Sequence, residues 1–138
     1  MNKLFFNRLE DIALSLIDWS DGLRCRHFSF IITKRRILSI GHNTQKTHPA
    51  NLKHKKFSLK TGEDVSEHKR TCSEFNAIVK LKNLTNTNTK KCTLINLRYD
   101  RNKNLAFAAP CMSCVSLLSY HELKSIIWTD SNGNYVES

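Results

Sequence analysis

The sequence predicts a three-layer α/β/α sandwich, with helices on both faces of a mixed sheet of four or five strands. An amphipathic helix pattern opens the chain, and short apolar runs typical of strands then alternate with helical patterns. The chain has 138 residues, of which 40% are hydrophobic, enough for a single modest core. We therefore expect residues 1–138 to fold as one domain.

The first expected element is an amphipathic helix over residues 3–18, within an N-terminal helical region at 1–22. Gly22 ends this region, because glycine readily adopts the backbone conformation found just after a helix. The apolar stripe predicts that the helix covers one face of the sheet. Its members are Phe5, Leu9, Ile12, Ala13, Leu16 and Ile17.

Two strands should follow, at residues 27–33 and 37–40, joined by an exposed basic turn at 34–36. Gly41-His42-Asn43 is expected to leave the sheet. The run Leu94-Ile95-Asn96-Leu97 indicates a largely buried central strand. The later elements, in order, are a helix over 72–84, a polar loop over 85–90, a strand over 93–99, an extended return over 105–109, a third helix from Cys111, a strand over 125–129 and a short antiparallel strand at 135–136.

Positive charge exceeds negative charge, with 22 Lys and Arg against 12 Asp and Glu, a net charge of +10. Such an excess favours an anionic partner, either a nucleotide phosphate or a nucleic-acid backbone. Many of these charges lie in segment 51–70, which is too long for a plain connection. This basic loop is expected to act as a lid, a phosphate grip or a nucleic-acid contact, or else to be an ordinary solvated loop.

The cysteines and the hydropathy predict the cellular compartment of the protein. The chain contains five cysteines, and their metal-type spacing fits a reducing cytoplasm better than a disulfide framework. Cys25 and Cys92 fall outside that spacing and are expected to be small buried residues. No apolar run approaches 18 residues, so we expect no membrane span and no membrane partner.

Three thiols and a carboxylate form the most informative motif. Cys111 and Cys114 begin a helical pattern three positions apart, so one helical turn lets both thiols bind a single ion. Cys72 supplies a third ligand, also at the start of a helix, where the dipole favours thiolate. Three protein ligands leave the fourth position of a zinc ion open for water, whose pKa zinc lowers to about 7. Glu74 is then placed to move that proton.

Other interpretations of these cysteines exist. A Cys-x-x-Cys pair by itself also fits a redox pair or half of a structural zinc ribbon. A structural site would need a fourth protein ligand, and His68, four residues before Cys72, can supply one. Neither interpretation explains Glu74 and Pro110.

Cys72-x-Glu74 with Pro110-Cys111-x-x-Cys114 resembles the signature of the zinc-dependent cytidine/deoxycytidylate deaminase superfamily, which is His or Cys, any residue, Glu, then Pro-Cys-x-x-Cys. Segment 36–43 with Lys46-Thr47-His48-Pro49 is similar to a compact branch known from phage-encoded deaminases. The resemblance covers about residues 26–130. That branch usually has His as its first ligand, whereas this chain has Cys72, as cytidine deaminases do.

The resemblance implies a sandwich of the cytidine deaminase type, one zinc ion per chain, and hydrolysis of cytosine to uracil and ammonia. It further implies that Asn43 contacts the substrate sugar, that the backbone N–H near Ser73 orients the base, and that the Ala109 carbonyl accepts from the amino group. His48, in the entrance loop, can line the pocket or face solvent. A homo-oligomer is also compatible, because deaminases with three cysteine ligands are commonly tetramers.

We therefore expect a zinc-dependent hydrolytic deaminase that acts on a free nucleotide or nucleoside, with deoxycytidylate favoured. An alternative with the same chemistry deaminates cytosine, or less readily adenine, in single-stranded DNA or RNA held by residues 51–70. A third hypothesis, from another class, is a non-catalytic, zinc-stabilised nucleic-acid-binding protein with His68 as the fourth ligand.

Overall fold

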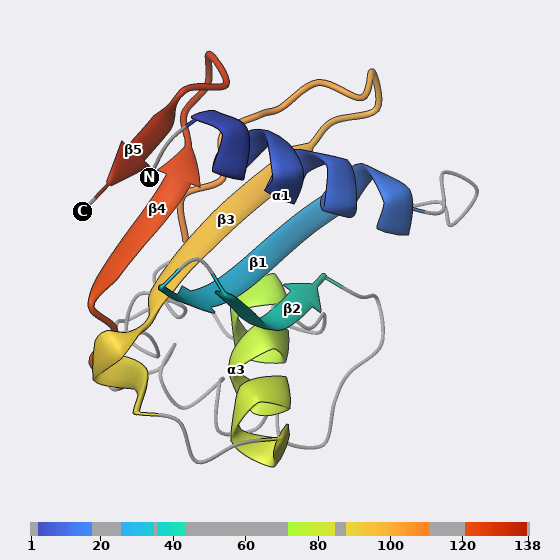
Figure 1. Ribbon diagram of the computed structural model, residues 1–138. Helices are drawn as coiled ribbons and strands as arrows, with labels where there is room; N and C mark the ends of the chain where they lie inside the picture. Colours follow the sequence, from blue (N-terminus) through green and yellow to red (C-terminus); the bar gives the residue numbers. More distant parts are fainter. Residues whose placement is uncertain are drawn as a thin grey trace, which may run out of the picture.

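The computed structural model describes residues 3–17, 26–34, 36–43, 72–84, 88–110 and 121–137. These residues form an α/β fold around a five-stranded mixed sheet (Figure 1). The elements are α1 (Lys3–Leu16), β1 (Arg26–Thr33), β2 (Arg36–His42), α3 (Ser73–Leu84), the 3-10 turn η2 (Thr89–Lys91), β3 (Thr93–Tyr99), β4 (Ser125–Thr129) and β5 (Tyr135–Glu137).

The strand order of the sheet is β2-β1-β3-β4-β5. β1 pairs antiparallel with both β2 and β3, β3 pairs parallel with β4, and β4 pairs antiparallel with β5. The predicted mixed sheet is thus confirmed. Of the four or five strands predicted, five is the correct number. The short antiparallel strand predicted at 135–136 is also confirmed, as β5.

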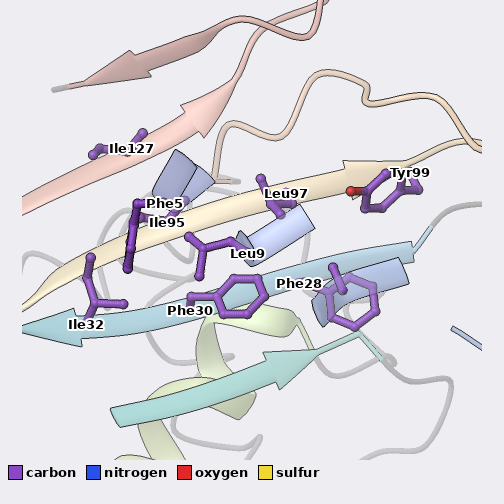
Figure 2. Packing of buried hydrophobic residues seen from close by; sticks show 10 residues of the cluster. Phe5, Leu9, Phe28, Phe30, Ile32, Ile95, Leu97, Tyr99 and Ile127 are labelled. Atoms are coloured by element: carbon purple, nitrogen blue, oxygen red, sulfur yellow. The ribbon is translucent and has the colours of Figure 1, made fainter. Parts of the chain in front are cut away.

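The two faces of the sheet are covered by different helices. Alternate residues of β1 and β3 point to opposite faces, so Phe30 and Ile95 pack under α1 while Ile31 and Leu94 pack against α3. Figure 1 shows α1 and α3 on opposite sides of the sheet. The α1 core is shown in Figure 2 and contains Phe5, Leu9, Phe28, Phe30, Ile32, Ile95, Leu97, Tyr99 and Ile127.

The amphipathic stripe of the first helix is confirmed in part. Phe5, Leu9 and Ala13 are buried, and Ile12 and Ile17 pack against the same core. Leu16 was wrongly placed on this stripe, because its side chain is 56% exposed. Leu16 is the last residue of α1, and its neighbour Ile17 packs against the core in its place.

Two boundaries differ from the sequence prediction. Gly41 and His42 do not leave the sheet but continue β2, because they pair with Ser29 and Phe28 of β1. The loop predicted at 85–90 contains the start of η2, in which Thr89 is buried. Asn88 caps this turn by accepting a hydrogen bond from the Lys90 N–H at 3.0 Å.

Several predictions concern residues that the structure does not describe: the basic loop 51–70, the third helix from Cys111, His48, His68 and Cys25. Cys92, in contrast, is described and is fully buried, as expected. Within the described residues, no helix has the length and apolar character needed to cross a membrane.

Candidate active site

The N-terminus of α3 carries the first half of the motif. Cys72 is the N-cap residue, since its carbonyl accepts the first helical hydrogen bond, from Asn76 N at 3.0 Å. Its side chain is half-buried, at the positive end of the helix dipole, which favours thiolate. Glu74 follows in the first turn and is only 6% exposed. A buried carboxylate requires donors, and the central strands of the sheet supply one.

Asn96 of β3 provides the donor for Glu74. Its amide nitrogen donates one hydrogen bond to Glu74 Oε1 at 2.7 Å and another to the Ala108 carbonyl at 3.2 Å. Its amide oxygen accepts from Ser29 Oγ of β1 at 2.6 Å. Because that oxygen faces Ser29, the nitrogen must face Glu74 and Ala108. Both amide hydrogens are used, and the orientation of the side chain is fixed.

The same network includes the first residue of the helix. Ser29 Oγ lies 2.8 Å from Ser73 Oγ, which in turn lies 3.4 Å from Glu74 Oε2. Ser29, Ser73 and Asn96 are each at most 2% exposed. A buried polar network of this kind restricts its members, so the Glu74 carboxylate is held against the central strand β3.

Asn96 also brings the two halves of the motif together. Ala108 lies three positions before Cys111, and its carbonyl shares the Asn96 amide with Glu74. Ala108 is further fixed by its N–H, which donates to the Thr129 carbonyl of β4 at 2.8 Å. The segment that leads into Cys111 is therefore held beside the helix that begins at Cys72.

Strand β2 holds α3 against the sheet along its length. Gly41 makes this possible: a Cβ atom at this position would overlap Ala77 N and Ser73 O and lie 2.8 Å from Ala77 Cα. Ser39 Oγ donates to the Ala77 carbonyl at 2.7 Å. His42 N donates to the Asn76 side-chain oxygen at 3.1 Å. The predicted Gly41-His42-Asn43 motif thus positions the helix that carries Glu74.

The residues expected to contact substrate are placed as follows. Asn43 directly follows β2, and its side-chain oxygen accepts from His27 N at 3.0 Å. Ser73 is the first residue of α3, so its N–H is one of those that a helix leaves without an internal partner. Ala109 is half-buried and lies between the fixed Ala108 and Pro110. The structure leaves their substrate contacts as predictions, and His48 lies outside the described residues.

Arg98 lies just before the turn at 100–104, where an arginine can either hold the hairpin together or bind a phosphate. Its Nη1 donates to the Phe107 carbonyl at 3.2 Å, so it holds the return segment against β3. This contact agrees with the first role.

Asn96 and Ser29 were not singled out from the sequence. Both interrupt apolar runs, Leu94-Ile95-Asn96-Leu97 and Phe28-Ser29-Phe30, that read as buried strand. A polar side chain at such a position must find a partner in the interior. That signal indicates a buried polar network, but only the folded sheet shows that Glu74 is its partner.

The described part of the motif, Cys72 and Glu74, is compatible with a metal site that has thiolate ligands. Cys72 is a thiol at a helix N-terminus, and a carboxylate that could move protons follows two residues later. Cys111 and Cys114, the other expected ligands, lie outside the described residues, and the described part contains no group of three potential ligands. All three members of the donor set, Cys72, Cys111 and Cys114, therefore remain predictions.

Comparison with solved structures relates the fold to two deaminases. The cytidine deaminase from Burkholderia pseudomallei matches with a TM-score of 0.60 at 12% identity, over 100% of this chain and 92% of that chain. The dCMP deaminase from the cyanophage S-TIM5 matches with TM-scores of 0.57 in apo form and 0.58 in complex with dCMP and dUMP, at 13% and 15% identity. Those two matches cover 95% of this chain and 86% and 85% of the phage chain.

No family model and no curated protein matches the sequence. At 12–15% identity the structural similarity concerns the fold rather than the substrate. The chain has the cytidine deaminase-like fold, with Cys72 and Glu74 at the N-terminus of a helix that packs on the centre of its sheet.

Proposed function

We propose that this protein is a zinc-dependent hydrolytic deaminase that converts cytosine to uracil in a free nucleotide or nucleoside, with deoxycytidylate preferred. The observation that carries the proposal is the Asn96 amide, which bonds both Glu74 Oε1 and the Ala108 carbonyl. These two hydrogen bonds place the buried Glu74 carboxylate, at the start of the helix that follows Cys72, beside the segment that precedes Cys111. The cytidine deaminase-like fold supports the same activity.

In this proposal Cys72, Cys111 and Cys114 hold one zinc ion per chain. When bound, zinc supplies an acidified water for attack on C4 of the base. Glu74 takes the proton of that water, passes it to N3 and later delivers a proton to the departing amino group. Asn96 acts through Glu74, because it fixes the carboxylate that must reach both positions.

Three residues would bind the substrate. The Ser73 N–H, at the open end of α3, would orient the base, and the Ala109 carbonyl would accept from the amino group. Asn43 already gives its side-chain oxygen to His27, so its amide nitrogen would meet the sugar hydroxyl. His48 would line the entrance.

The substrate class rests on two considerations. The phage neighbour was solved in complex with dCMP and dUMP, and the net charge of +10 suits a phosphorylated substrate. The same charge would also suit cytosine in single-stranded DNA or RNA, which is the second candidate. Thiolate ligands and the unpaired, buried Cys92 favour a reducing compartment, which we take to be the cytoplasm.

A Glu74→Gln variant tests the catalytic role. It keeps the size of the side chain and an acceptor for Asn96, but it cannot carry a proton. We expect kcat to fall by about 10²–10⁴-fold, the usual contribution of a general acid–base group, while bound zinc stays near one per chain. Ammonia release measures the first quantity, and elemental analysis measures the second.

Glu122→Gln is the matched control. Glu122 is an exposed carboxylate that precedes β4 and pairs with Lys90, not with Asn96. It should behave as wild type. Turnover retained in Glu74→Gln would refute the proton-transfer role. Parallel assays with deoxycytidylate, cytidine and a cytosine-containing single-stranded oligonucleotide distinguish the candidate substrates. Uracil formed only in the oligonucleotide would replace the first candidate with the second.

A further inference from the structure

One end of the sheet gathers exposed cations from four segments that are separate in sequence. It is the end at which β1 stops and β2, β3 and β4 begin, and Figure 1 shows η2 beside these strand ends. We call this surface the basic end. Its exposed members are Lys34, Arg36, Lys82, Lys90, Lys91 and Lys124.

Contacts show that these residues belong to one surface. Thr33 pairs with Arg36 across the turn that contains Lys34. Thr33 Oγ1 also donates to the Lys91 carbonyl at 3.2 Å, which joins that turn to η2. The Lys124 N–H donates to the Cys92 carbonyl at 2.9 Å, which joins η2 to the start of β4.

Lys82, near the end of α3, completes the surface. Burial, and then the charge of Lys82, lower the pKa of His121. Burial raises the pKa of the Cys92 thiol, and the charge of Lys82 opposes that rise. Lys82 thus lies within electrostatic range of residues on both sides of η2. His121, in turn, joins η2 through its carbonyl, which accepts from Thr89 Oγ1.

Negative charge at this end is scarce. Among the described residues the basic end has one carboxylate, Glu122, which forms an ion pair with Lys90 at 3.1 Å. The other described carboxylates lie elsewhere: Glu10 and Asp11 on α1, Glu74 in the candidate active site, Asp100 and Asp130 on the turns after β3 and β4, and Glu137 on β5. Six positive charges therefore face one negative charge.

The chemistry of the surface selects the kind of partner. The large hydrophobic side chains that are exposed among the described residues, Leu4, Leu14, Leu16, Phe107 and Val136, all lie away from the basic end. The described residues of the basic end supply no apolar wedge for insertion into a lipid bilayer. They also supply no exposed aromatic side chain for base stacking. Lysine ammonium groups, as mobile point charges, suit a row of phosphates.

We propose that the basic end binds the sugar-phosphate backbone of a nucleic acid, without reading its bases. From β2 to β4 the surface spans three strand spacings, about 14 Å. Along a duplex that length carries about four phosphates of one strand, at about 3.4 Å each. Up to four phosphate contacts are therefore within reach. The surface lies about 10 Å or more from Asn96 along β3, so binding there is separate from the candidate active site.

The test is fluorescence anisotropy of the full chain with a labelled mixed-sequence DNA duplex and its RNA counterpart, over a series of salt concentrations. For about four contacts, log K should fall with log[salt] with a slope of about −3 to −4. A slope shallower than about −2 for wild type, or no binding of either duplex, would overturn the proposal. A preference for DNA or RNA identifies which source of the backbone is used and supports the proposal.

Two matched triple variants locate the contact. Arg36→Gln, Lys91→Gln and Lys124→Gln together remove three charges from the basic end, at exposed side chains. Lys3→Gln, Arg8→Gln and Arg101→Gln remove three exposed charges from α1 and from the turn after β3. The first variant should reduce the slope by about 2 to 3 and weaken binding at least tenfold at about 0.1 M salt. The second should weaken binding less than about threefold.

Equal weakening in both variants would show that net charge alone attracts the nucleic acid, and would refute the proposal. So would binding to phosphatidylserine vesicles that is lost in the first variant while nucleic-acid binding is kept. Deamination of deoxycytidylate should be unchanged in both variants. Because the binding assay does not depend on turnover, failure of the proposed enzymatic activity leaves this test intact.

Discussion

The side chain of Asn96 links the stability of the interior to the chemistry of the candidate site. It bonds Ser29 Oγ, Glu74 Oε1 and the Ala108 carbonyl, all in the interior of the protein. In Asn96→Ala each of these groups loses one hydrogen bond, and a buried polar group left unsatisfied costs about 1–3 kcal/mol. We expect a lower free energy of unfolding and a kcat reduced by at least tenfold, with KM changed much less. Chemical denaturation and deamination kinetics measure these effects.

Ser39→Ala is the control for this variant. Ser39 Oγ donates to the Ala77 carbonyl on the same helix, but no contact joins it to Glu74. Its loss should also lower stability, by about 1 kcal/mol, and should leave kcat near the wild-type value. If both variants lose activity equally, the effect of Asn96 is general destabilisation and not positioning of Glu74.

At the scale of elements, the contact between β2 and α3 decides where the Glu74 carboxylate lies. In Gly41→Ala the new methyl group would overlap Ala77 N and Ser73 O, which are backbone atoms and cannot rotate away. We expect α3 to shift, stability to fall by about 1–3 kcal/mol or more, and deamination to be strongly impaired. Denaturant unfolding and activity, measured on the same preparation, test this.

Gly133→Ala separates this steric effect from the general cost of replacing glycine. Gly133 has a φ of +80°, and its added Cβ would lie 3.6 Å from Leu105 Cβ, an ordinary contact. The substitution should cost about 1 kcal/mol through backbone strain. The turn between β4 and β5 lies at the edge of the sheet opposite β2, so activity should be kept. Full activity in Gly41→Ala would refute the role of the close approach.

At the scale of the whole molecule, the N-terminal helix α1 contacts the C-terminal strand β5. Phe6 of α1 stacks on Tyr135 of β5 with ring centroids 3.9 Å apart, and Tyr135 donates to Glu10 Oε2 at 2.9 Å. Burial raises the pKa of Tyr135 well above its ordinary value near 10, and the Glu10 hydrogen bond raises it further. The folded protein therefore keeps this proton above pH 10, where the unfolded chain releases it.

The sign of the pH dependence follows from that shift. This contribution to stability is fully present below about pH 10 and is lost as the pH rises toward the folded-state pKa. Tyr135→Phe should cost about 0.5–1.5 kcal/mol at pH 8 and should show a shallower loss of stability above pH 10 than wild type. Urea unfolding at several alkaline pH values measures both. An unchanged slope would contradict the coupling between Tyr135 and Glu10.

The sequence by itself determined most of the described elements and the local order of the motif residues. Hydrophobic periodicity is local, so the strands at 93–99 and 125–129 were predicted with the bounds that the structure has. The Cys72-x-Glu74 spacing likewise depends only on neighbours in the chain. The mixed sheet and the cytidine deaminase-like fold were also predicted, because their order of elements and motif can be read along the sequence.

Only the tertiary structure decided which distant residues meet. Glu74 accepts a hydrogen bond from Asn96 of β3, and Asn96 in turn bonds Ser29 of β1 and Ala108. No local sequence pattern specifies such pairings. The close approach at Gly41 depends on how α3 lies on β2, and the basic end depends on four segments ending on one side of the sheet. Leu16 was misplaced for the same reason, since periodicity shows which side of a helix is apolar but not which of its last residues reaches the core.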